Sequence, residues 1–141
     1  MPFIPMKPLL EHALANGYAV PSFCAWNADI MRTVLDTAQE LAAPVILMNG
    51  PPEFELLDPF DTSAAANALL ARRRVRAALL LDHGDSVERA QTCIEAGYTS
   101  VMLDLSARPF EENVAGLRRT VEIARGRGVT GEGEIGHGGR G

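Results

Sequence analysis

Short apolar runs alternate with helix-like segments along the whole chain, and this alternation restricts the possible folds more than any other feature. Runs typical of strands occupy residues 18–24, 45–48, 76–83, 99–104 and 129–135. The stretches between them carry apolar residues at intervals of three and four, the spacing of an amphipathic helix. Such strand–helix alternation predicts a parallel sheet with right-handed crossovers.

Local signals indicate where the helices begin and end. A helix over residues 7–16 is expected ahead of the first strand, and Gly17 follows it as a stop. The expected N-terminal caps of the next three helices are Asn27 or Asp29, Thr62 or Ser63, and Ser86. These helices are expected to end near Ala42, Arg73 and Ala96, and a last helix is expected from Pro109 to about Arg125.

The first predicted strand is not followed by the glycine fingerprint with which dinucleotide-binding folds hold phosphate. A (β/α) barrel is therefore the better prediction among parallel α/β folds. A complete barrel has eight strands and typically ~250 residues. The 141 residues here supply about five strands. We therefore expect one domain, residues 1–141, that forms the N-terminal portion of a TIM-type (β/α)8 barrel.

Charge and composition exclude several classes of protein. A net charge of −5 argues against a nucleic-acid-binding surface, and no apolar run approaches the ~20 residues that cross a bilayer. The first seven residues lack the pattern of a signal peptide, so a cytoplasmic location is expected. Cys24 and Cys93 form no C-x-x-C pair, which favours reduced thiols. Lys7 is the only lysine, which argues against Schiff-base catalysis.

Polar side chains stand at the ends of three successive predicted strands. Asp82 and His83 end one apolar run, Asp104 ends the next, and Glu132 and Glu134 lie two residues apart on the last. Neighbouring parallel strands would bring these residues to one edge of the sheet. One imidazole with several carboxylates can bind a divalent metal, and the imidazole favours Zn²⁺.

Structural interpretations of the same residues remain open. An Asp–His pair also occurs in hydrogen-bonded loops, and Asp104 can be a turn residue. Adjacent residues of a strand point to opposite faces, so Asp82 and His83 share a site only if the backbone turns, which Gly84 permits. Glu132 and Glu134 share a face, where two carboxylates either bind a metal or repel each other.

Other charged residues favour structural roles. His12 lies in the first predicted helix and is expected at the surface, and His137 is expected to be a loop residue because glycines flank it. Glu53 is expected to belong to a solvated surface. The arginines at 72–74 and Arg76 lie at the end of a predicted helix, where the helix dipole favours cations, so we prefer this interpretation to a polyanion site.

Four motifs in order resemble the class II, zinc-dependent ketose-bisphosphate aldolases, which include the fructose- and tagatose-bisphosphate aldolases. The motifs are residues 81–84, 100–106, 109–113 and 132–136. Each motif is weak alone, but the four in order with this spacing are a strong signal. The resemblance covers essentially the whole chain and implies the (β/α)8 barrel.

The resemblance also implies a reaction, the reversible aldol cleavage of a ketose (bis)phosphate to dihydroxyacetone phosphate and an aldehyde. It places the catalytic acid/base on Asp82 and one of three zinc-binding histidines on His83. Asp104 and Glu134 match carboxylates that hold a second or displaced divalent ion in some members, and Glu132 is an additional candidate. The family further implies a monovalent cation, a small-molecule sugar phosphate and a homo-oligomer, either dimer or tetramer.

Several departures from the family pattern leave other functions open. The two remaining zinc histidines and the phosphate-binding loops of the family have no counterpart within residues 1–141. Residues 136–139 match the start of a mobile loop, but the loop glutamate is replaced at 140–141. Cys24 and Gly50 stand where some members have a substrate-contacting asparagine and a small hydroxyl residue.

These departures motivate two alternatives to a class II aldolase. One is a truncated, catalytically inactive barrel that acts as an oligomeric metal-binding module. The other is an enzyme of the same fold that acts on a different sugar phosphate.

Overall fold

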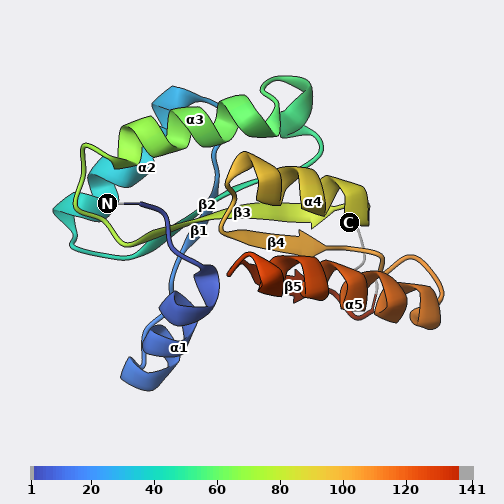
Figure 1. The fold of residues 1–141 in the computed structure, drawn as a ribbon. Coiled ribbons are helices and arrows are strands. Elements are labelled where there is room, and N and C mark those ends of the chain that lie inside the picture. The colour runs from blue at the N-terminus through green and yellow to red at the C-terminus, as the bar shows by residue number, and fades with distance from the viewer. Residues whose placement is uncertain (1, 137–141) are drawn as a thin grey trace.

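The computed structural model, which describes residues 2–136, confirms the parallel α/β architecture (Figure 1). Its strands form one sheet in the order β1-β2-β3-β4-β5, and every neighbouring pair is parallel. The strands are β1 (Ser22–Cys24), β2 (Val45–Asn49), β3 (Ala77–Gly84), β4 (Ser100–Leu103) and β5 (Thr130–Gly133). Sequential order with parallel pairing is the arrangement of a (β/α) barrel, here with five strands.

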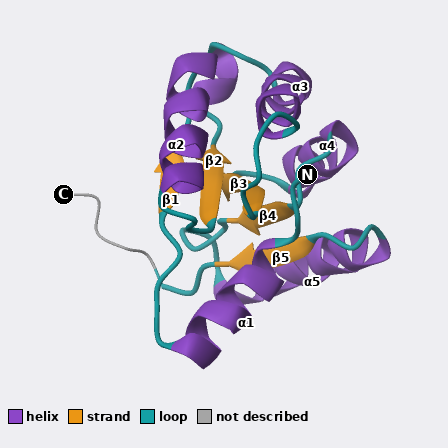
Figure 2. Ribbon diagram, turned by 90° about the vertical axis from the view of Figure 1, so that its left-hand side faces the viewer, coloured by secondary structure: helices purple, strands orange, loops and turns teal. Residues whose placement is uncertain are grey.

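Helices connect the strands and cover one side of the sheet. They are α1 (Met6–Asn16), α2 (Ala28–Glu40), the short 3₁₀ helix η1 (Glu53–Glu55), α3 (Pro59–Leu70), α4 (Val87–Ala96) and α5 (Phe110–Gly126). Figure 2 shows that α2, α3, α4 and α5 follow one another around the outer side of the sheet. Helix α1 belongs to the other face, where it contributes to a separate core. No helix in residues 2–136 has the length and apolar character needed to cross a lipid bilayer.

Most of the predicted helix ends are confirmed. The Asn27 side chain accepts a hydrogen bond from the Ile30 N–H, and Ser86 Oγ accepts one from the Arg89 N–H. Gly17 ends α1 in the left-handed conformation, and Gly97 ends α4 in the same way. These ends depend on residues within one helical turn, which is why local sequence was sufficient to find them.

The prediction for α3 was wrong by about one turn at each end. Asp58, rather than Thr62 or Ser63, is the N-terminal cap, and its carboxylate accepts the N–H groups of Phe60 and Asp61. Pro59 follows as the first helical residue, where its missing N–H costs no hydrogen bond. The helix ends at Leu70 instead of continuing to Arg73.

Three strands are shorter than predicted, and β4 lacks one residue at each end of the predicted range 99–104. The first begins at Ser22, not at residue 18, because Pro21 has no N–H to donate to the sheet. The last ends at Gly133, so Glu134 lies directly after β5 instead of within it. This places Glu134 on the segment that leaves the carboxyl end of the sheet.

Apolar residues on the two faces of the sheet form separate cores. On β3, Leu79 and Leu81 belong to the larger core beneath α2–α5. Leu80 faces the other way and packs with Met6 and Leu9 of α1 in the smaller core. Because side chains alternate along a strand, Asp82 points to the same inward face of the sheet as Leu80. It lies nearer the carboxyl end of β3 than the residues that pack against α1.

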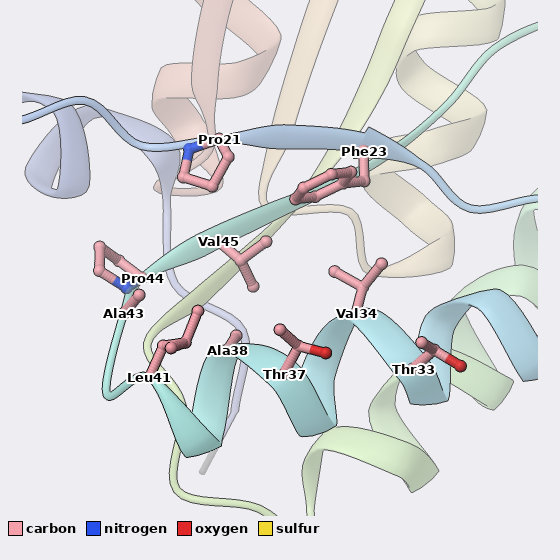
Figure 3. A pocket seen from close by; sticks show the side chains of 10 residues that line it. All are labelled: Pro21, Phe23, Thr33, Val34, Thr37, Ala38, Leu41, Ala43, Pro44 and Val45. Carbon is pink, nitrogen blue, oxygen red and sulfur yellow. The ribbon is translucent and has the colours of Figure 1, made fainter.

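An apolar groove lies at the free edge of the sheet, between β1 and α2 (Figure 3). It has a volume of about 310 Å³ and is lined by residues that include Phe23, Val34 and Leu41. Phe23 is 45% exposed and Leu41 is 72% exposed. Within residues 2–136 β1 pairs only with β2, so an open strand edge adjoins an open apolar surface.

Candidate active site

The carboxyl end of β3 contains a bulge that changes the direction of the His83 side chain. Leu81 pairs with Val101 and Gly84 pairs with Leu103, so residues 82 and 83 of β3 stand opposite residue 102 alone. His83 absorbs the extra residue with a φ of 46°, which is left-handed. The change of backbone direction that Asp82 and His83 need in order to share a site therefore occurs at His83, and Gly84, which would permit it, does not have a positive φ.

Gly84 is needed for space. A Cβ atom there would lie 2.8 Å from the Met102 carbonyl oxygen and 2.7 Å from Leu81 Cδ2, both too close for a real contact. The missing side chain lets β3 and β4 approach each other at this point. The Gly84 carbonyl then accepts a hydrogen bond of 2.9 Å from the Asp104 N–H. Gly84 thereby holds Asp104 beside the end of β3.

His83, Asp104 and Glu134 form a compact cluster at the ends of β3, β4 and β5. His83 Nδ1 lies 2.8 Å from Asp104 Oδ2 and 3.7 Å from Glu134 Oε2. One ligand atom from each residue lies within 4.8 Å of the other two. The structure thus brings together these predicted candidates from positions far apart in the sequence. Glu132 is not a member of this cluster.

Asp104 is held in its ionised form. Ser106 donates its backbone N–H and its hydroxyl to Asp104 Oδ1, and His83 lies against Oδ2. These hydrogen bonds, first of all that of the Ser106 side chain, lower the pKa of Asp104 to about 2. The hydrogen bond to Asp104 in turn raises the pKa of His83, although partial burial of the ring opposes this.

The cluster has the chemistry of a divalent metal site. It offers an imidazole nitrogen and two carboxylates, and carboxylate oxygens 2.8 and 3.7 Å from His83 Nδ1 are at distances that two ligands of one ion with bonds of ~2.0–2.2 Å can have. Two arrangements suit these contacts. All three residues can be ligands, or Asp104 can accept the Nδ1–H of His83 and so orient Nε2 toward the metal.

Asp82 lies next to the cluster but on the inward face, with its side chain partly buried. Loss of solvation is the main cause that raises the pKa of Asp82, and the negative charges of Glu53 and Glu134 raise it further, whereas His83 lowers it. Glu132 has a raised pKa because of partial desolvation and the charge of Asp82. Both carboxylates beside the three-residue cluster therefore have raised pKa values, and the charge of Asp82 contributes to the shift of Glu132.

The loop after β2 contributes Glu53, a residue that sequence reasoning does not assign to the site. The Gly50 N–H donates to Glu53 Oε2 at 2.7 Å, and a Cβ on Gly50 would lie 2.7 Å from the Asp82 carbonyl oxygen. Glu53 thus lies near the site, although its sequence context predicts a solvated surface residue. The charge of Glu53 raises the pKa of Asp82, but no local sequence pattern indicates this, because the two residues are 29 positions apart in the chain.

Cys24 also lies near Asp82 and Glu53. Its thiol is exposed, and its pKa is raised first by desolvation and then by the charges of Asp82 and Glu53. Cys24 and Gly50, two of the positions at which the chain departs from the family pattern, therefore both lie near Asp82.

The remaining candidates lie away from the cluster or outside the described residues. His12 is exposed, as expected, and its Nδ1 lies 2.8 Å from the Tyr18 hydroxyl. Arg73 Nε forms an ion pair of 2.7 Å with Asp36, which supports a structural role for this arginine. His137 and the loop positions 138–141 lie outside the described residues.

Known proteins resemble the chain in sequence. The family model for class-II fructose-bisphosphate aldolase matches residues 4–141. The fructose-bisphosphate aldolase of Staphylococcus aureus is 39% identical over 139 residues, an alignment that covers 96% of this chain and 49% of that protein. The probable fructose-bisphosphate aldolase of Bacillus subtilis is 40% identical with the same coverage.

A solved structure confirms the barrel-type fold. The crystal structure of the YdjI aldolase from Escherichia coli K12 superposes with a TM-score of 0.90 at 29% identity, over 96% of this chain and 52% of that one. The chain spans about half the length of the curated relatives it matches. Its family membership follows from the family model, which covers nearly every residue: the chain belongs to the class-II fructose-bisphosphate aldolase family.

Proposed function

We propose that the protein that contains this chain catalyses the zinc-dependent, reversible aldol cleavage of a ketose bisphosphate to dihydroxyacetone phosphate and an aldehyde. The observation that carries the proposal is the His83–Asp104–Glu134 cluster beside Asp82, at the carboxyl ends of successive parallel strands. This is the face on which (β/α) barrels build their active sites. Residues 1–141 would be the N-terminal portion of that barrel.

Asp82 is proposed as the acid/base. In cleavage it would take the proton from the C4 hydroxyl of the ketose, and in condensation it would return a proton to the aldehyde oxygen. Its raised pKa suits this role, because a carboxylate with a pKa nearer to neutrality is a stronger base. The side chain lies on the inward face, partly shielded from solvent, where a bound substrate could reach it.

His83, Asp104 and Glu134 are proposed to hold the metal. A bound zinc ion would supply Lewis-acid polarisation of the substrate ketone. Ser106 fixes Asp104 Oδ1, so Oδ2 stays beside His83 Nδ1, where both atoms could face the ion. Glu134 is the more adaptable member, since its carboxylate lies 3.7 Å from His83 Nδ1, beyond direct hydrogen-bonding distance.

The test of the acid/base is release of dihydroxyacetone phosphate from fructose 1,6- and tagatose 1,6-bisphosphate by the whole protein. Asp82→Asn keeps the shape of the side chain and should reduce turnover by about 10²–10⁴-fold. Asp85→Asn is the control, because Asp85 lies on the same turn but pairs with Arg89 at 2.8 Å. Equal turnover by wild type and Asp82→Asn would contradict the assignment.

Zinc titration of residues 1–141 tests the metal site separately. We expect one zinc ion per chain, bound more weakly than by a site with three histidines, and weaker still after Asp104→Asn. If the chain forms a dimer that binds one metal ion per chain, and the whole protein shows no turnover, the alternative of a metal-binding module is favoured.

A different sugar phosphate is the second candidate substrate. The observation that favours it is that two departures from the family pattern, Cys24 and Gly50, lie near Asp82. A panel of ketose phosphates distinguishes the candidates, since efficient cleavage of fructose 1,6-bisphosphate would exclude this one.

The remaining expectations stay predictions. They are a homo-oligomer, a second divalent ion, a monovalent cation and a cytoplasmic location. The apolar groove between β1 and α2 supports association, because burial of Phe23 and Leu41 would remove apolar surface from water.

A further inference from the structure

Asn113 makes a long-range contact to the backbone of Glu134, one of the three residues of the proposed metal cluster. It lies in the first turns of α5, with only 4% of its surface exposed. Its side-chain Nδ2 donates a hydrogen bond of 2.8 Å to the Glu134 carbonyl oxygen, across 21 residues of sequence. Its Oδ1 has no hydrogen-bond partner among the described residues. Within residues 2–136 the amide therefore has one polar contact, and that contact is with Glu134.

We infer that Asn113 is a positioning residue: by holding the Glu134 backbone against α5, it places the Glu134 carboxylate beside His83. The metal part of this inference rests on the proposed function, whereas the placement of Glu134 does not.

The segment that carries Glu134 has few other attachments. β5 lies at the edge of the described sheet, where it pairs only with β4, and that pairing ends at Gly133. Glu134 comes one residue later, beyond the hydrogen bonds of the sheet. No other side chain among the described residues forms a hydrogen bond with the backbone of Glu134, so Asn113 replaces the missing strand contact.

Close packing next to this hydrogen bond keeps α5 near β5. A Cβ on Gly133 would lie 2.2 Å from Leu117 Cδ2, so Leu117 occupies the space that a side chain at position 133 would need. Leu117 is one helical turn beyond Asn113 on the same helix. Helix α5 therefore contacts two consecutive residues at the end of β5: Leu117 packs over Gly133, and Asn113 bonds to Glu134.

The chemistry requires a donor at position 113. The Glu134 carbonyl oxygen accepts only from an N–H or O–H group, and loss of the donor from this partly buried hydrogen bond is unfavourable. Asn113→Asp keeps the size of the side chain but sets a carboxylate oxygen against the carbonyl. Asn113→Leu keeps approximately the shape and removes the polar atoms.

Thr120→Val is the matched control. Thr120 lies two turns further along α5, is 1% exposed, and its Oγ1 has no hydrogen-bond partner among the described residues. Its replacement by valine changes a buried polar residue of the same helix without removing a contact to Glu134. A general effect of altering α5 would appear in this variant, and an effect through Glu134 would not.

Hydrogen exchange of the metal-free chain is the first measurement. In the wild type the Asn113 side-chain amide protons should exchange slowly, which can be measured without any variant. In both Asn113 variants the backbone amides of β5, which are protected by pairing with β4, should exchange about five- to tenfold faster, because the strand end next to Glu134 has lost a hydrogen bond. Thr120→Val should leave them unchanged.

Zinc affinity is the second measurement. Loss of a residue that orients a ligand typically weakens metal binding about 10- to 100-fold, and we expect this for both Asn113 variants but not for Thr120→Val. Rapid exchange of the wild-type Asn113 amide, or unchanged exchange of the β5 amides in both variants, would overturn the inference. So would wild-type zinc affinity in both variants. A wild type that binds no zinc would refute the proposed metal site, while the exchange experiment would still decide the role of Asn113.

Discussion

Gly84 offers a direct test of how closely β3 and β4 must approach each other at the candidate site. In Gly84→Ala the new Cβ would stand 2.7 Å from Leu81 Cδ2 and 2.8 Å from the Met102 carbonyl oxygen. The leucine side chain can rotate, but the carbonyl belongs to β4 and cannot move alone. Rotation of Leu81 relieves only one of the two contacts, so the strands themselves must separate.

The expected cost is that of overpacking, about 1–3 kcal/mol of the free energy of unfolding. For a chain of 141 residues this corresponds to a fall in the melting temperature of roughly 3–12 °C. Separation of the strands would also lengthen the hydrogen bond between the Asp104 N–H and the Gly84 carbonyl, which measures 2.9 Å. Asp104 would then move away from His83, so zinc affinity should fall together with stability.

Urea unfolding and zinc titration of residues 1–141 measure the two effects. Gly126→Ala is the control, because no atom lies within 4 Å of the added Cβ and Gly126 is the last residue of α5. Alanine there should leave stability unchanged or raise it by up to ~1 kcal/mol, since alanine favours helix more than glycine does. If Gly84→Ala is as stable as the wild type, the close contact between β3 and β4 does not constrain the site as we argue.

Two further predictions concern pH and the core. The pKa of Asp104 is lowered to about 2, so its contribution to stability is complete above its unfolded value of 3.8 and is lost as the pH falls toward 2. The pKa of His83 is raised above 6.5, so its contribution is present below that value and is lost at higher pH. Without metal, the difference in urea midpoint between wild type and Asp104→Asn should therefore be largest near pH 5 and smaller at pH 2 and pH 9; a constant difference would contradict this. Leu79→Ala should destabilise the fold by about 2–5 kcal/mol because Leu79 is 0% exposed. Leu56→Ala, at a residue that is 72% exposed, should change stability by less than ~0.5 kcal/mol. Similar urea midpoints for the two variants would refute our account of the core.

Much of the candidate site could be predicted because strand ends are visible in sequence. The run from Ala77 to Leu81 is apolar throughout, as expected of a strand buried on both faces, and it stops at Asp82. Since parallel strands place their carboxyl ends at one edge, the sequence alone predicts Asp104 and Glu134 near His83. The cluster of these three residues agrees with that expectation.

Competing local signals limited the prediction at some boundaries. Thr62 and Asp58 are both acceptable helix caps, and only the combination of Asp58 with Pro59 at the first helical position favours the earlier start. Glu134 was expected within the last strand. Strand length depends on how far the partner continues, and pairing with β4 ends at Gly133.

The sequence by itself therefore determined the alternation of strands and helices, the parallel sheet and the polar residues at its edge, because all of these depend on local periodicity and composition. The tertiary structure decided the bulge that turns His83, the closeness of Glu53 to Asp82 and the hydrogen bond from Asn113 to Glu134. These contacts join residues far apart in the chain or depend on the register between two strands. Register and packing are set by the fold as a whole, and no local pattern encodes them.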